Sequence, residues 1–135
     1  MISKGFMKYS GLIATLWLFA SQSFAHEMRP AFAQLIETEE AASAEVGVSV
    51  TLRQPIVSGF RPDLALDLGG CRLGAEIISQ RQEGTLIQSW QEYCDQALSQ
   101  SKLAIRNLYP GVSEVLVSVT HLDGSLQRFV VRPDN

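Results

Sequence analysis

Hydrophobic and polar residues alternate along much of the chain, with the period of a β-strand that has one buried and one solvated face. The clearest run is Ser43–Leu52, in which every second residue from Val46 onward is aliphatic. The same pattern predicts further strands at Pro30–Thr38, Leu64–Leu68, Ala75–Gln82, Thr85–Tyr93, Ser101–Arg106, Val115–Val119 and Ser125–Arg132. A helical turn fits only the segments Glu39–Ala42 and Tyr93–Gln100.

Turn residues separate these predicted strands. Glu83-Gly84 and His121–Gly124 are typical of tight hairpins, whereas Gln54–Asp63 holds two prolines and a glycine and predicts a longer loop. Seven or eight short strands at this spacing favour an all-β fold. We therefore expect one antiparallel β-sandwich, immunoglobulin-like, over residues 26–135.

The first 25 residues have the layout of a secretory signal peptide. Lys4 and Lys8 give a positive start, an uncharged apolar run of about ten residues follows, and Ser23 and Ala25 suit a cleavage site. A run of that length is too short for a bilayer span, which needs about 20 residues. Cleavage after Ala25 predicts an exported chain, periplasmic or secreted, whose net charge falls from −3 to −5 because both lysines are lost.

Two cysteines, Cys71 and Cys94, remain in the exported part. An even count in a small exported domain predicts a disulfide, and its loop of about 24 residues would stabilise the fold by about 3 kcal/mol. A structural zinc site is less favoured because it needs four ligands, and a Cys-x-x-Cys redox motif is missing. We expect Trp90 in the core near this bridge.

Composition and motifs favour a non-catalytic protein. The chain has 14 acidic and 11 basic residues and no long basic run, which argues against a nucleic-acid partner. Catalytic motifs such as Gly-x-Ser-x-Gly and His-Glu-x-x-His are missing. Asp63 with Asp67, or Glu92 with Asp95, could pair for sugar hydrolysis, but acidic residues at such intervals usually mark solvated strand faces. The sequence thus identifies no small-molecule substrate.

His26 would become the first residue of the processed chain. A terminal histidine offers its amino nitrogen and its imidazole to one metal ion, a chelate that suits Cu(II) or Ni(II). A further ligand is needed, and His121 is the only other histidine. The alternative is a cleavage site that happens to precede a histidine at the surface.

The segment His26-Glu27-Met28-Arg29-Pro30-Ala31-Phe32 resembles the start of the processed HupE/UreJ family proteins. Weaker matches follow in the same order, at Leu35 and Glu37, Gly70-Cys71, Trp90, Cys94, Leu108, Val115–Val119 and Asp123-Gly124. The resemblance implies an exported ectodomain, which in that family precedes membrane helices linked to the transport of nickel or other metals. No such helices follow here, so we expect a stand-alone relative, half of a split system or a truncated reading frame.

Together these observations favour an accessory or binding domain that docks to a membrane partner of the metal-transport type. Glu27, Arg29 and Pro30, within the family-like segment, are the expected interaction residues. The alternative is a copper- or nickel-binding protein that uses His26 and His121. The sequence does not specify the oligomeric state.

Overall fold

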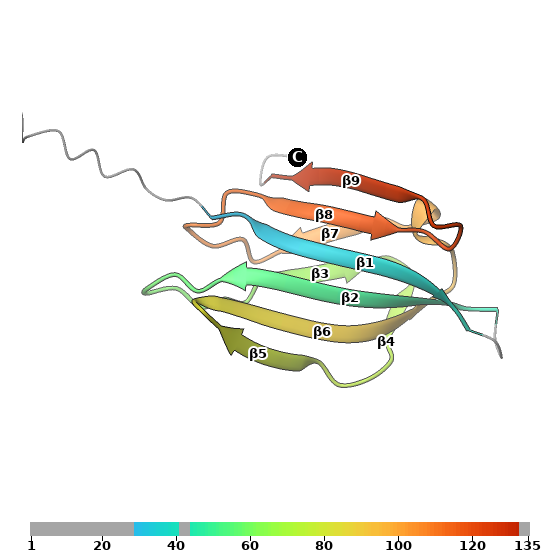
Figure 1. The fold of residues 1–135 in the computed structure, drawn as a ribbon, viewed down its shortest axis with the longest axis horizontal. Coiled ribbons are helices and arrows are strands. Elements are labelled where there is room, and N and C mark those ends of the chain that lie inside the picture. Colours follow the sequence, from blue (N-terminus) through green and yellow to red (C-terminus); the bar gives the residue numbers. More distant parts are fainter. Residues whose placement is uncertain (1–28, 41–43, 133–135) are drawn as a thin grey trace, which may run out of the picture.

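The computed structural model describes residues 29–40 and 44–132, which are built mainly from β-strands (Figure 1). The elements in chain order are β1 (Ala31–Glu39), β2 (Val46–Pro55), β3 (Ala65–Leu68), β4 (Cys71–Leu73), β5 (Ile78–Gln82), β6 (Thr85–Cys94), η1 (Leu98–Gln100), β7 (Leu103–Arg106), β8 (Val115–Thr120) and β9 (Leu126–Val131). Within these ranges η1, a short 3-10 turn, is the one helical element, and no helix has the length and apolar character to cross a bilayer. The prediction of an all-β fold is confirmed.

Seven strands form the main sheet, in the order β4-β6-β2-β1-β8-β9, and β5 pairs with the same edge of β6 as β4 does. β1 and β8 run parallel, with Leu35 opposite Val119, whereas the other pairings are antiparallel. The sheet is therefore mixed and not purely antiparallel as expected. A parallel pair needs a long connection, so no local turn signal in the sequence marks it.

A second sheet contains only β3 and β7, and it lies behind β8, β1 and β2 in Figure 1. The arrangement is sandwich-like, but its two layers are very unequal. The core lies between them and includes Ala31, Ala33, Leu35, Val48, Val50, Leu52, Leu64, Leu66, Leu68, Val115, Val117 and Val119. Fully burying a valine or leucine side chain stabilises a fold by about 1.5–3 kcal/mol, so these residues hold the layers together.

Two buried polar side chains connect loops to β2. The Gln54 side chain accepts a hydrogen bond from the Leu64 backbone N–H at 3.0 Å and donates to Gln88 at 2.9 Å. The Tyr109 hydroxyl donates to the Pro55 carbonyl oxygen. Burial, with a smaller effect of Asp63, raises the pKa of Tyr109 to about 12, so this phenol remains a donor.

The predicted disulfide is confirmed and joins Cys71 of β4 to Cys94 of β6, where the two residues stand directly opposite each other. Cys94 is fully buried, and Trp90 packs against the core as expected. The hairpin turn between β5 and β6 is also confirmed, because Glu83 and Gly84 both have positive φ, at 47° and 76°. A disulfide is typical of proteins from oxidising compartments.

Candidate functional site

One face of the main sheet points away from the β3–β7 sheet, and no described segment lies over it in Figure 1. Residue alternation determines this face, because Ala31, Ala33 and Leu35 of β1 point into the core and their neighbours point outward. We call it the open face; its central members are Phe32, Gln34, Ile36, Ser49, Thr51, Arg53, Leu116, Ser118, Thr120, Leu126, Arg128 and Val130. Several of its apolar side chains are exposed to solvent, Phe32 by 48%.

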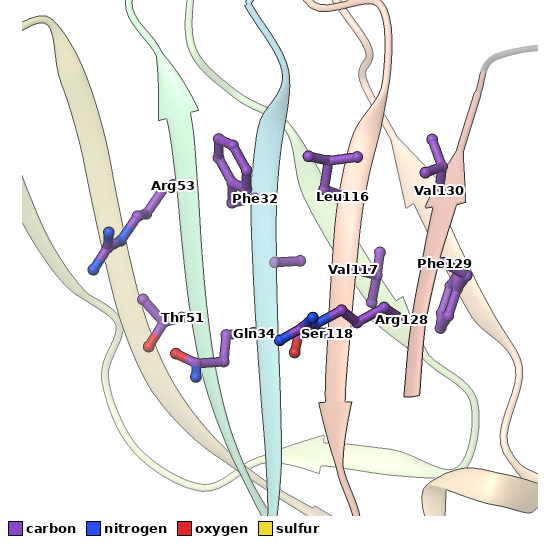
Figure 2. Close-up of a pocket in the computed structure, with 11 residues that line it drawn as sticks. Phe32, Gln34, Thr51, Arg53, Leu116, Val117, Ser118, Arg128, Phe129 and Val130 are labelled. Atoms are coloured by element: carbon purple, nitrogen blue, oxygen red, sulfur yellow. The ribbon is translucent and has the colours of Figure 1, made fainter. Parts of the chain in front are cut away.

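Strand register aligns these side chains in rows across β2, β1, β8 and β9. The first row is Arg53, Phe32, Leu116 and Val130. The second row is Thr51, Gln34, Ser118 and Arg128. Figure 2 shows both rows and shows the Arg128 side chain extending from β9 across β8 toward β1. An apolar row therefore lies beside a polar row that carries a cation.

The open face is hollowed at these two rows. A depression of about 570 Å³ is lined by residues of both rows. A second depression, of about 550 Å³, shares Phe32 and Arg53 with it and continues past Arg29 and Pro30 toward the β5–β6 turn. Two of the expected interaction residues, Arg29 and Pro30, thus line a surface continuous with the open face.

Charge on the open face is positive at its centre. Among the described residues, neither Arg53 nor Arg128 has an ion-pair partner. The outward-pointing positions of β6, β2, β1, β8 and β9 on this face hold no Asp or Glu, although the whole chain has a net charge of −3. At the margins of the face, Arg72 forms an ion pair with Glu45 and Arg132 forms one with Glu114, with N–O distances of 2.8 Å and 3.2 Å.

A second feature is a histidine–carboxylate pair beside the core. Glu37 of β1 points inward and its side chain is 2% exposed, and its Oε1 lies 2.7 Å from Nδ1 of His121. His121 Nε2 lies 3.4 Å from Oε1 of Gln127. Both ring nitrogens face oxygen acceptors, so the imidazolium, with two N–H donors, suits this site best. The hydrogen bond to Glu37 is the main cause that raises the pKa of His121, while burial opposes it.

This pair predicts that stability depends on pH. The pKa of His121 is higher in the folded chain than its ordinary value of about 6.5, so the folded state binds the proton more tightly. The stabilisation is fully present below about pH 6.5 and is lost as the pH rises through the folded-state pKa. Urea unfolding at a series of pH values should therefore give a free energy of unfolding that falls above about pH 6.5. A His121→Gln variant should lack this component, and an identical pH dependence in both proteins would contradict the assignment.

The acidic residues considered in the sequence have different surroundings in the structure. Asp67 pairs instead with Arg106, whose Nε lies 2.6 Å from its carboxylate, and Asp95 is exposed in the turn after β6. Glu92 points to the core side of β6, and its Oε2 is buried without a hydrogen-bond partner among the described residues. Burial raises the pKa of Glu92, so this carboxyl binds a proton more readily than an exposed one.

The predicted metal ligands are not brought together in the described part of the chain. His26 and Glu27, like the signal peptide, lie outside the described residues, and His121 uses Nδ1 to bond Glu37. No group of three or more His, Cys, Asp or Glu side chains in the described ranges could hold a metal ion. A copper or nickel site at His26 and His121 therefore stays a prediction.

Sequence reasoning did not identify the open face as a site. The available signal is β1 itself, where Phe32 and Ile36 alternate with Ala33 and Leu35, so that both faces carry apolar residues. A strand with two apolar faces is typically covered on both sides. Comparison with protein-family models, curated protein sequences and solved structures found no match to this chain.

Proposed function

We propose that this chain is a non-enzymatic, exported binding domain that docks a partner protein through the open face. The observation that carries the proposal is the hollowed apolar row of Phe32, Leu116 and Val130, beside Arg53 and Arg128, neither of which pairs with a carboxylate of the described residues. Exposed apolar surface in a hollow is a common property of interaction sites.

The dimensions of this face suit an amphipathic helix. A row across four neighbouring strands is about 14 Å long at about 4.8 Å per spacing, and the apolar stripe of a helix from i to i+7 is about 10.5 Å long at about 1.5 Å per residue. Helices bind such grooves through apolar residues at i, i+3, i+4 and i+7. The apolar row would contact these apolar residues of the helix, and Phe32 is the largest side chain of that row.

The two arginines on this face indicate which charged residues the partner helix carries. Arg53 stands at one end of the apolar row, and the Arg128 side chain extends along the polar row toward β1, so a complementary helix would carry one carboxylate at the end of its apolar stripe and another beside the stripe. An anionic lipid surface is less suited, because the face is hollow and the whole chain has a net charge of −3.

A membrane protein is the proposed source of this helix. The layout of residues 1–25 supports export, and the disulfide supports an oxidising compartment. The similarity of the segment from His26 to Phe32 to HupE/UreJ proteins supports a partner of the metal-transport type, since such a domain there accompanies membrane helices. Phe32 belongs both to that segment and to the open face.

The test uses a designed helical peptide with a leucine stripe flanked by glutamates, and the same peptide with lysines in place of the glutamates. We expect the glutamate peptide to bind at least about ten-fold more tightly in calorimetric titrations, because the arginines attract it and repel the other peptide. Phe32→Ser and Arg128→Glu should each weaken binding at least about ten-fold.

Two variants serve as matched controls. Leu122 is as exposed as Phe32, at 48%, but lies in the β8–β9 turn, and Arg61 lies in the β2–β3 loop. Leu122→Ser and Arg61→Glu should leave binding unchanged. Equal binding of both peptides, or binding of anionic lipid vesicles in place of the peptide through Phe32 and Arg128, would refute the proposal.

A further inference from the structure

A separate cavity lies at the end of the molecule where β8 passes into β9. Its volume is about 250 Å³, and it lies between the main sheet and the segment formed by η1 and β7. Its apolar walls are Leu35, Leu68, Leu98, Leu103, Val119 and Phe129. Engineered apolar cavities of about 150 Å³ already bind benzene, so this space can hold a small organic molecule.

The polar side chains of this cavity are gathered toward solvent. Leu35, Leu68 and Val119 are buried, whereas Gln127 and Ser99 are exposed. His121 is intermediate, with 19% of its side chain exposed. The cavity is therefore amphipathic, with an apolar inner part and a polar mouth, and a ligand would enter with its apolar end first.

The mouth favours an anionic head group. Glu37 holds Nδ1 of His121 from inside, so Nε2 is the ring nitrogen left for a ligand. Among the described residues, the hydrogen-bond partner of that nitrogen is Gln127 Oε1, at the long distance of 3.4 Å. A carboxylate oxygen is a stronger acceptor for the N–H of an imidazolium than an amide oxygen is.

We propose that this cavity binds a small monocarboxylate with a short apolar tail, its carboxylate on His121 Nε2 and its tail among Leu35, Val119 and Phe129. Glu37 has a positioning role, because it orients the ring and keeps it charged. The cavity opens on the other side of the sheet from the open face, since Leu35 and Val119 point to the core side of β1 and β8, although Phe129 lines both depressions.

The test is a titration of the protein with hexanoate, followed by amide chemical shifts in NMR spectra, with 1-hexanol as the uncharged comparison. We expect a Kd on the order of 1 mM, as for other ligands of this size, and binding at least about ten-fold weaker for 1-hexanol. The shifts should be largest near Leu35, Val119 and Phe129.

Three variants test whether hexanoate binds inside this cavity and through the charged imidazole. His121→Gln keeps a donor for Glu37 but removes the charge, and Leu103→Phe fills the cavity; each should weaken hexanoate binding at least about ten-fold. Leu108→Phe, at another half-buried leucine outside the cavity, should leave it unchanged. Equal affinity for hexanol and hexanoate, shifts centred on the open face, or no shifts up to about 10 mM would each overturn the proposal.

Discussion

Replacing His121 with alanine is expected to lower the free energy of unfolding by about 3 kcal/mol, because it leaves a buried carboxylate without its charged partner. The Glu37 side chain is 2% exposed, and its Oε1 is 2.7 Å from His121 Nδ1. Alanine offers no donor in its place, so the buried carboxylate of Glu37 loses its partner. For an m-value of about 1.5 kcal/mol/M, the urea midpoint should fall by about 2 M.

A double-mutant cycle with Glu37→Gln tests whether the unpaired carboxylate causes this loss. The neutral glutamine side chain costs less to bury than an unpaired carboxylate. H121A combined with E37Q should therefore be more stable than H121A alone, so the effects of the two substitutions are not additive. If H121A unfolds at the wild-type urea concentration, the ion pair contributes nothing to stability and the prediction is wrong.

The same pair shows where prediction from the sequence succeeded and where it could not. Alternation identified β1, β2 and β8 to within a few residues, because a strand with one buried face has a local period of two. It does not say which face of β1 is buried. Glu37 shares the buried face with Ala33 and Leu35, and its partner there is His121, a residue 84 positions away, so no local pattern contains that contact.

The pairing of strands could likewise be predicted only where a local sequence signal marks it. The β5–β6 hairpin was predictable because Glu83-Gly84 is a local turn signal, and the disulfide because only two cysteines were available. β4 was missed because three residues are too few to show alternation. The parallel pairing of β1 with β8 places Phe32 beside Leu116, so the apolar row of the open face exists only in the folded sheet.

Removal of the disulfide is expected to have an effect of similar size. In a Cys71→Ala/Cys94→Ala variant, the free energy of unfolding should fall by about 3 kcal/mol, because the unfolded chain regains the freedom of a loop of about 24 residues. The loss is also local, since β4 is only three residues long and the bridge ties it to β6. The Arg72 guanidinium, 4.9 Å from the Tyr93 ring centre, should lose that contact when β4 detaches.

Urea unfolding with and without a thiol reductant measures this effect. Reductant should lower the stability of the wild-type protein by about the same 3 kcal/mol and should leave the double variant unchanged. The open face is formed by β2, β1, β8 and β9, on the other side of β6 from β4, so the glutamate peptide should still bind the folded double variant. A variant as stable as the wild-type protein would mean that the pairing of β4 with β6 does not depend on the bridge.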